Sequence, residues 1–238
     1  LPDSIRMPLF GLAGQLYPKA DWAPKVFRAK STLESIGRSS VEGYFHSVSF
    51  NSNAIRSRLF SESLKSELQG YQAIEVFNRH KRNISSDDSQ SLVQYLDIKT
   101  YLPGDILTKV DRASMAHALE VRVPLLDHEL VEWMAGLAPD LKLKNREGKY
   151  IFKKSLESFL PNDVLYRPKM GFAVPLASWF KGPLKQQVSK SLLGDTMMNC
   201  GLFDPQFLKT IVDQNQSGLR DHSTTIWSLL MFESFLHK

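Results

Sequence analysis

The sequence predicts a mainly α-helical fold, and three observations lead to this prediction. Apolar residues recur at spacings of three or four along most of the 238 residues. Residues typical of helix caps precede several of these stretches, and glycine or proline follows them. No alternation of strand, helix and strand is visible, so the sequence by itself does not indicate a doubly wound sheet.

The composition is that of a globular protein, with 42% hydrophobic and 23% charged residues. No apolar run reaches the ~18 residues that a membrane-spanning helix needs, so we expect no membrane partner. The single cysteine excludes an internal disulfide framework and a multi-thiolate zinc site, and we expect a cytoplasmic protein. A net charge of +5 permits a polyanionic ligand such as a nucleotide, without indicating nucleic acid.

The first third of the chain predicts an irregular beginning followed by short helices. Four prolines within residues 1–24 predict an irregular segment with short helical pieces. Helical spacing then marks four stretches, at residues 26–36, 41–48, 64–68 and 74–77. The polar stretch 83–91 predicts a loop that ends in a helix N-cap.

The middle of the chain predicts two helices separated by Pro103 and Gly104. The first runs from Leu92 to Leu102 and stops at that dipeptide. The second is opened by Asp105 and continues to about Leu119. Residues 120–124 (EVRVP) alternate charge with valine, so we expect a short extended piece there.

The last elements are again helices. Asp127 stands where an N-cap belongs, and Gly136 would end that helix. Residues 148–160 predict another helix, and the two prolines and glycine of 166–175 predict a loop. Three more helices are expected, one starting near Pro183, one with Asp204 as N-cap before Pro205, and one over 224–236.

The densest group of charges lies between residues 105 and 128. Asp105, Lys109 and Arg112 are spaced so that they share one helix face. The other charged candidates in this group are Asp111, Glu120, Arg122 and Asp127. Apolar residues interleave these charges, so we expect a buried helix whose charges meet partners or a charged ligand. Ion pairs on a solvated helix would explain the same spacing, and spacing alone does not choose between the two.

A second candidate is the run 167–172 (RPKMGF), which contains two cations. Pro168 restricts the backbone and Gly171 allows a sharp turn, so the loop could present Lys169 to an anion at a fixed position. A solvated surface lysine is the plainer interpretation. The six histidines lack metal-binding spacing, so we expect no metal site, and no Walker A, G-x-G-x-x-G or G-x-S-x-G motif occurs.

Three of these segments together resemble a known family. Residues 105–127 (DILTKVDRASMAHALEVRVPLLD), 148–150 and 167–172 resemble the C-terminal synthetase domain of glutamine-hydrolysing asparagine synthetases. Looser similarity extends over the whole chain, and the sequence looks most like the asparagine-synthetase-like amidotransferases of bacterial exosortase and exopolysaccharide systems. By this resemblance, residues 1–238 are the helical C-terminal portion of an α/β adenine-nucleotide domain of the PP-loop ATPase type, lacking most of its parallel sheet. The first residue is Leu1 rather than methionine, and we expect a piece of a longer protein.

The resemblance implies ATP-dependent chemistry. In the family, ATP and a carboxylate react with Mg²⁺ to give an acyl-adenylate and pyrophosphate, and ammonia released from glutamine converts the adenylate to an amide. On this chain it implies that Lys169 meets the phosphates, that Lys109 lines the substrate pocket and that Asp105 orients Lys109. Further positions that match the motif, as binding or structural residues, are Asp111, Arg112, Glu120, Arg122, Asp127 and Arg167.

The sequence also departs from the family pattern. The S-G-G-x-D-S pyrophosphate loop, the acidic glycine-rich loop and the catalytic cysteine of the glutaminase domain are absent. These loops would supply most contacts to ATP and Mg²⁺, so we expect the isolated chain to be inactive. The expected partners are ATP, a carboxylate and ammonia. The sequence leaves open which carboxylate is used and whether the protein forms a homodimer. A related acyl-adenylate ligase and a non-catalytic helical module that binds a partner are the alternatives.

Overall fold

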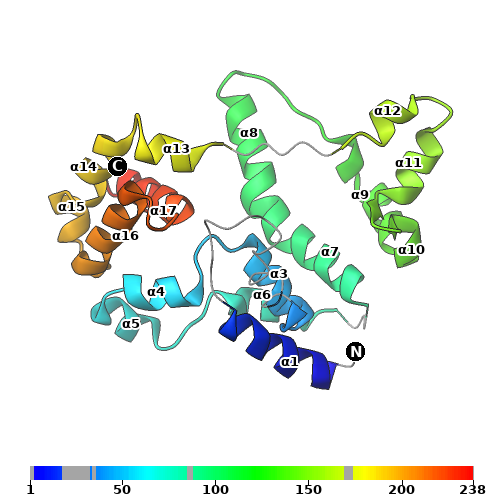
Figure 1. Cartoon of the computed structure of the whole chain (residues 1–238). Coiled ribbons are helices and arrows are strands. Elements are labelled where there is room, and N and C mark those ends of the chain that lie inside the picture. Colours follow the sequence, from blue (N-terminus) through cyan, green and yellow to red (C-terminus); the bar gives the residue numbers. More distant parts are fainter. Residues whose placement is uncertain (1–2, 18–32, 34–35, 85–87, 169–173, 238) are drawn as a thin grey trace. The chain divides into compact units, whose positions relative to one another are not determined.

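The computed structural model describes residues 3–17, 33, 36–84, 88–168 and 174–237. These residues are mostly helical, and the part described holds one two-stranded sheet, so the prediction of a mainly α fold is confirmed (Figure 1). The chain divides into two compact units. Unit 1 combines residues 1–76 with 173–238, and unit 2 consists of residues 77–172. None of the described helices is long and apolar enough to cross a membrane.

Unit 1 begins with helix α1 (Asp3–Leu16), which is longer than the sequence predicted. The expectation of short helical pieces is wrong here because Pro8 lies in the second turn, where it removes only one hydrogen bond near the helix start. A Cβ atom on Gly37 would lie 2.6 Å from the backbone nitrogen of Gly11, so α1 passes very close to this glycine. The helix expected over residues 26–36 lies largely outside the described residues.

Helix α3 (Ser40–Val48) confirms the helix predicted over 41–48. Its start is a capping box, in which the hydroxyl of Ser39 accepts from the amide of Glu42 at 3.3 Å and the Glu42 carboxylate accepts from the amide of Ser39 at 3.0 Å. Val41 and Tyr44 form the buried side of the helix, in agreement with the apolar spacing.

The larger core of unit 1 is built by six further helices, namely α4 (Asn53–Leu59), α13 (Leu176–Lys181), α14 (Lys185–Leu192), α15 (Asp195–Met198), α16 (Pro205–Ser217) and α17 (Ser223–Leu236). Helix α5 (Glu62–Leu68) contributes no side chain to this core. The fully buried side chains come mainly from α14, α16 and α17, and include Val188, Leu192, Leu208, Ile211 and Ile226. The predicted cap is confirmed, since the Asp204 carboxylate accepts from the amide of Phe207 at 2.6 Å and Pro205 opens the helix.

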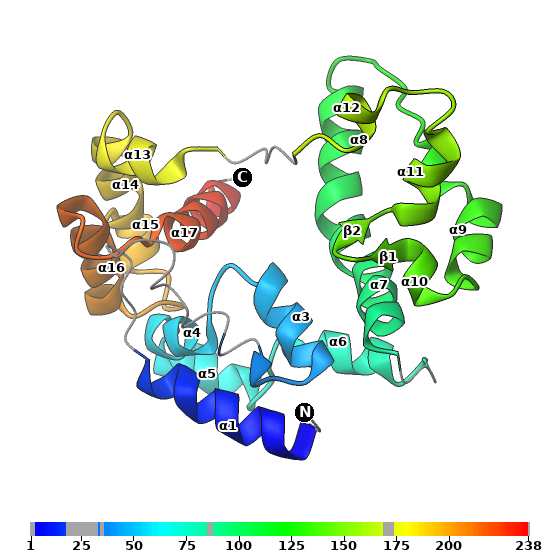
Figure 2. The ribbon, with the colours of Figure 1, turned by 45° about the vertical axis from the view of Figure 1, so that its right-hand side comes forward.

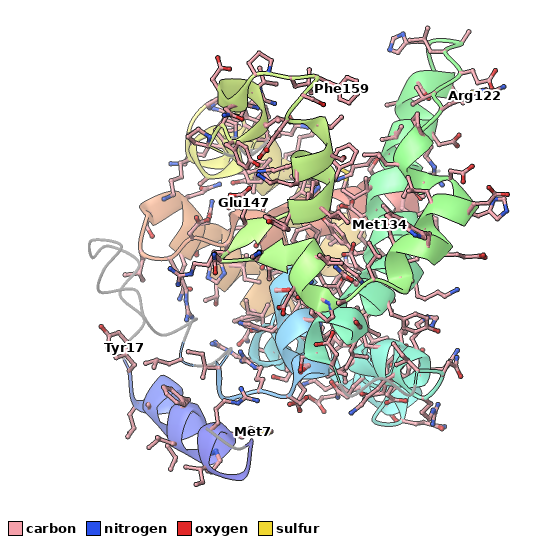
Figure 3. All side chains as sticks on the ribbon, turned by 90° about the vertical axis from the view of Figure 1, so that its right-hand side faces the viewer. Met7, Tyr17, Arg122, Met134, Glu147 and Phe159 are labelled. Atoms are coloured by element: carbon pink, nitrogen blue, oxygen red, sulfur yellow. The ribbon has the colours of Figure 1, made fainter. Side chains whose placement is uncertain are left out.

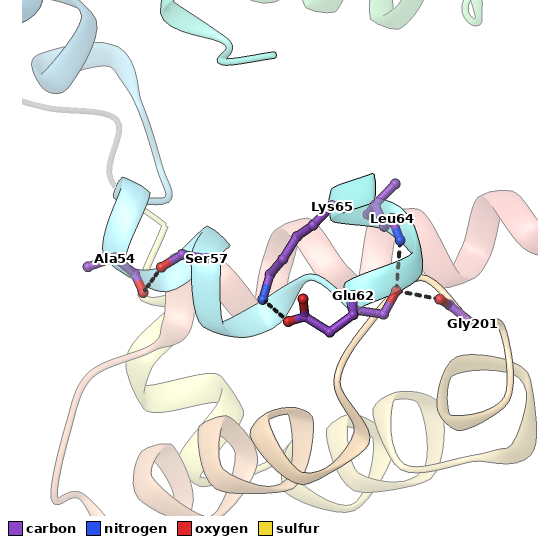
Figure 4. A network of polar contacts seen from close by, with 7 residues as sticks. Ala54, Ser57, Glu62, Leu64, Lys65 and Gly201 are labelled. Carbon is purple, nitrogen blue, oxygen red and sulfur yellow. Dashed lines mark hydrogen bonds and ion pairs between the residues drawn. The ribbon is translucent and has the colours of Figure 1, made fainter. Parts of the chain in front are cut away.

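The turn between α4 and α5 joins the early part of the chain to the late part. The amide of Ser61 donates to the carbonyl of Leu202 at 3.0 Å. The Ser61 hydroxyl donates to the carbonyl of Gly201 at 2.6 Å (Figure 4). The amide of Asp204 donates in return to the carbonyl of Leu59 at 2.8 Å. Unit 1 is therefore held together by contacts between segments far apart in sequence.

Unit 2 holds the segment in which the sequence concentrates its charges. Helix α6 (Ile74–Lys81) spans the boundary between the two units. The elements after it are α7 (Ser89–Lys99), a π-helical turn η2 (Leu102–Leu107), α8 (Thr108–Met115), a 3-10 turn η3 (Pro124–Leu126), α9 (His128–Ala135), α10 (Pro139–Lys142), β1 (Leu143–Lys144), β2 (Glu147–Gly148), α11 (Tyr150–Leu156) and α12 (Asn162–Leu165). The two strands pair antiparallel and lie beside α10 (Figure 2).

The predicted stop at Pro103 and Gly104 is wrong. Pro103 lies in the first turn of η2, where a backbone donor is not needed, and the amide of Gly104 donates to the carbonyl of Thr100 at 3.0 Å. Asp105 therefore lies inside a π-helical turn that continues into α8. That helix ends at Met115 rather than Leu119, because Ala118 adopts a positive φ of 55°.

Two further expectations need correction in unit 2. The helix predicted over residues 148–160 begins at Tyr150, because Gly148 belongs to β2 and Lys149 has a left-handed backbone with φ of 58°; it ends at Leu156. The extended piece expected over residues 120–124 reaches only to Val123, whose backbone is extended with φ of −114° and ψ of 91°, because Pro124 starts the turn η3.

The interior of unit 2 is small. Among its described residues only Leu92, Leu96 and Lys142 are buried. The ammonium of Lys142 donates to the carbonyl of Ala135 at 3.2 Å and to Oε1 of Gln94 at 3.5 Å, so this lysine links α7, α9 and α10.

Candidate functional site

Asp105 and Lys109 form the centre of the candidate site. Asp105 lies on η2 and Lys109 one turn later on α8, and the Lys109 ammonium donates to Oδ2 of Asp105 at 2.9 Å. The Lys109 side chain is 64% exposed and that of Asp105 is 33% exposed. Hydrogen bonding to Asp105 raises the pKa of Lys109 above its ordinary value, so the amine stays protonated well above neutral pH. The two residues thus form the ion pair that a spacing of four on a helix allows.

Tyr101 lies one turn before Asp105 and is half-buried, although the sequence analysis did not single it out. The Asp105 carboxylate raises the pKa of Tyr101 above its ordinary value, and partial burial adds to the effect. The signal that could have identified it is the constant spacing of four residues from 101 to 105 to 109. The π-helical turn begins directly after Tyr101 and includes Asp105, and such turns are frequent at functional sites.

The expectation that this helix is buried is wrong. Eight apolar side chains of the segment are at least 36% exposed, namely Ile106, Val110, Met115, Leu119, Val121, Val123, Leu125 and Leu126. An apolar sequence favours burial, but burial also needs a surface to pack against. All eight side chains stay exposed in the structure.

Two other predicted residues pair with each other. The guanidinium of Arg122 lies 2.7 Å from Oε1 of Glu120, and both side chains are exposed in the segment that follows α8 (Figure 3). Asp127 has a structural role as the predicted N-cap of α9, because its Oδ1 accepts from the amides of Glu129 and Leu130 at 3.0 and 3.2 Å. Gly136 ends this helix as predicted.

The remaining predicted residues are not brought into contact with this group. The side chains of Asp111, Arg112 and Arg167 are exposed and make no hydrogen bond or ion pair within the described part of the chain. Lys169, the predicted catalytic lysine, lies outside the described residues.

Tyr166, directly before Arg167, belongs to a second polar cluster that the sequence analysis missed. Its hydroxyl donates to Oε1 of Glu157 at 2.6 Å, and the ammonium of Lys154 lies 2.8 Å from Oε2 of the same carboxylate. The hydrogen bonds from Lys154 and then Tyr166 lower the pKa of Glu157. The beginning of the 166–175 segment is thereby attached to α11.

The site offers cations and an oriented carboxylate rather than a metal centre. Lys109, Arg112 and Arg167 are exposed, which suits an anionic ligand approaching from solvent. Among the residues with described positions, no three His, Cys, Asp or Glu side chains gather as metal ligands would.

Comparison with known proteins identifies the family. The family model described as asparagine synthase matches residues 9–237. A glutamine-hydrolysing asparagine synthetase 1 of Bacillus subtilis is 30% identical over 227 residues, which cover 93% of this chain and 34% of that protein. A putative glutamine-hydrolysing asparagine synthetase of Mycobacterium tuberculosis is 34% identical over 145 residues, covering 61% of this chain and 22% of that protein. The mouse glutamine-hydrolysing asparagine synthetase is 29% identical over 206 residues, covering 80% and 35% respectively.

The chain spans about a third of the length of the curated relatives with the longest matches. No solved structure matches it significantly. The family match covers both units and includes all the charged residues described above. The chain therefore belongs to the asparagine synthase family.

Proposed function

We propose that this chain is part of an ATP-dependent, glutamine-hydrolysing amidotransferase. The enzyme adenylates a carboxylate, aspartate or a related acid, and converts the adenylate to an amide with ammonia taken from glutamine. The observation that carries the proposal is the family match over residues 9–237, together with relatives whose names include glutamine hydrolysis.

The geometry of unit 2 agrees with a role in binding the triphosphate and the pyrophosphate. During adenylation, negative charge develops on the leaving pyrophosphate. Cations that are already in place stabilise this charge and lower the activation barrier. Lys109 is such a cation, because Asp105 holds its ammonium at 2.9 Å. Arg112, on the same helix, and Arg167 are exposed and can add further positive charge.

Lys169 supplies the most direct contact to the phosphates in this proposal. It follows Tyr166 by three residues, and the hydroxyl of Tyr166 is fixed to Glu157. A compact ammonium suits a phosphate oxygen, and the family resemblance supports this role for Lys169.

Mg²⁺ is the metal that this chemistry uses, and the described residues do not fit it. Mg²⁺ prefers several oxygen ligands, and no cluster of three acidic or histidine side chains is present in the described ranges. We therefore assign no metal ligand to this part of the chain.

The test is an assay of the full-length protein with ATP, glutamine and a panel of carboxylic acids that includes aspartate. The proposal predicts an amide product, with AMP and pyrophosphate formed in equal amounts. Formation of ADP and phosphate would indicate a different activation chemistry. Condensation within one substrate, without use of ammonia, would favour the related ring-closing ligases. The absence of any ATP-dependent product with every acid would favour a non-catalytic module.

A further inference from the structure

Tyr166 is held at its backbone, its ring and its hydroxyl. The backbone amide donates to the carbonyl of Asn162 at 2.9 Å, where α12 ends. The hydroxyl donates to Oε1 of Glu157, directly after α11, at 2.6 Å. The ammonium of Lys153 lies 5.1 Å from the centre of the ring, a distance typical of a cation–π contact. Tyr166 is therefore fixed at three points, although its side chain lies at the surface and is 39% exposed.

The two side chains that hold Tyr166 have further partners. The ammonium of Lys154 donates to both carboxylate oxygens of Glu157, at 3.1 and 2.8 Å. Lys153 forms an ion pair with Glu147 on β2, and the Lys153 side chain is only 17% exposed. A single surface ion pair contributes little, because two long side chains must be ordered for one contact. Here the contacts form a connected group, and we call its members the tyrosine anchor: Glu147, Lys153, Lys154, Glu157 and Tyr166.

Arg167 follows the tyrosine anchor directly, and its backbone is restricted from both sides. Tyr166 precedes it, and Pro168 comes next in the sequence. The ring of a proline disfavours helical backbone for the residue before it and restricts that residue to extended conformations. The Cα atom of Arg167 therefore has little freedom to move relative to α11.

The Arg167 guanidinium is available to a ligand. Within the part of the chain that the structure describes it makes no hydrogen bond or ion pair, and its side chain is exposed. The two lysines of the tyrosine anchor differ from it, because each is already paired with a carboxylate. A planar guanidinium can donate two parallel hydrogen bonds to a phosphate group. A restricted backbone that carries an unpaired guanidinium is thus well suited to hold an anion at a defined place.

We propose that Tyr166 is a positioning residue, which fixes the backbone of Arg167 so that its guanidinium is held where a phosphate group of the substrate binds. This inference rests on the proposed function, because it assigns Arg167 to the polyphosphate of that reaction. Tyr166 itself touches no substrate, and its effect on the reaction is transmitted through Arg167.

The first experiment asks whether Tyr166 fixes this backbone in solution, and needs no activity. It measures the ¹⁵N relaxation order parameter of the Arg167 amide in the 238-residue chain. The parent value should be near that of a rigid backbone, about 0.85, and Tyr166→Leu should lower it towards the flexible range, below about 0.6. Tyr166→Phe keeps the ring beneath Lys153 and should give an intermediate value. A parent value already in the flexible range, or one that Tyr166→Leu leaves unchanged, overturns the proposal.

Tyr95 provides the matched control for this measurement. It is another tyrosine of unit 2 with a cation near its ring, since the ammonium of Lys99 on the same helix α7 lies 5.8 Å from the ring centre. Tyr95→Leu should leave the Arg167 order parameter unchanged. Glu157→Ala removes the acceptor of the Tyr166 hydroxyl and should act as Tyr166→Phe does. If Tyr95→Leu mobilises Arg167 as strongly as Tyr166→Leu, the effect is a general loosening of unit 2 and the proposal is wrong.

The second experiment is a double-mutant cycle on amide formation by the full-length protein. Tyr166→Phe should lower kcat by roughly 10-fold and Tyr166→Leu by up to about 100-fold, the size expected when a reacting group is displaced by about 1 Å. In an Arg167→Ala background the same changes should have little further effect, because the group that Tyr166 positions is already gone. Tyr95→Phe should leave kcat unchanged in both backgrounds.

Independent effects in this cycle would contradict the proposal. If the losses caused by Tyr166→Leu and Arg167→Ala multiply, Tyr166 does not act through Arg167, and its contribution is only structural. If the full-length protein forms no amide with any acid, the proposed function is overturned. The order parameter then decides by itself whether Tyr166 fixes the Arg167 backbone.

Discussion

The hydroxyl of Ser61 donates a 2.6 Å hydrogen bond to the carbonyl of Gly201, 140 residues further along the chain. The same serine caps α5 by accepting from the amide of Leu64 at 3.1 Å (Figure 4). One side chain thus closes a helix end and joins the two sequence segments of unit 1. The residues between them include all of unit 2, which carries the candidate site.

Replacing Ser61 by alanine should destabilise unit 1 by about 1–2 kcal/mol, because a cap and a bond between distant segments are lost together. Ser57→Ala is the control, since the Ser57 hydroxyl only returns to the carbonyl of Ala54 in its own helix at 3.2 Å and should be close to neutral. Urea unfolding followed by the methyl signals of Ile211 and Ile226 reports on this unit. Equal effects of the two substitutions would show that the bond to Gly201 adds nothing.

Local interactions account for what could be predicted from sequence. The caps at Asp127 and Asp204 depend on a side chain and an amide two or three residues away, so the sequence contains all the information needed. The pair of Asp105 and Lys109 belongs to the same class, because a spacing of four on a helix defines it.

The predictions that proved wrong concern features that depend on an unusual backbone conformation or on packing between distant elements. Pro103 and Gly104 usually end a helix, but here they fit the first turn of a π-helical segment, which propensity does not reveal. The exposure of Val121 and Val123 depends on which elements pack nearby, and apolar patterning cannot specify those.

Asp88 should make the stability of α7 depend on pH in the acidic range. Its carboxylate caps this helix, and the hydrogen bonds it receives from Ser91 lower its pKa below the ordinary 3.8. A group whose pKa is lower in the folded state stabilises the fold above its unfolded pKa and loses that contribution as the pH falls through the folded value. Amide-exchange protection in α7 should therefore decrease below about pH 4.

Asp88→Asn is the informative variant for this prediction, since asparagine caps a helix without titrating. Its protection should be independent of pH over the same range, and Asp88→Ala should lose protection at every pH. A parent chain and an Asp88→Asn variant with the same acid dependence would contradict the assignment.

Lys169→Ala in the full-length protein should lower the rate of amide formation by roughly 10²- to 10³-fold, the size expected when one preorganised charge is removed from a transition state. Lys190→Ala removes an exposed lysine from α14 and should leave the rate unchanged. Both variants should unfold at the same urea concentration as the parent protein. Full activity of Lys169→Ala would show that the resemblance assigned this lysine incorrectly.

The 238-residue chain by itself should not catalyse exchange between ATP and pyrophosphate. Preorganised charges accelerate a reaction most strongly where water is excluded, and Lys109 is 64% exposed here, in a medium that weakens its attraction for phosphate. The described residues also provide no cluster of ligands for Mg²⁺. With labelled pyrophosphate, ATP and the acid that the full-length protein uses, exchange should stay at the level of the Lys109→Ala chain. Exchange at a rate close to that of the full-length protein would mean that the catalytic groups are complete within these residues, and that the exposed segment after Asp105 is covered when substrate binds.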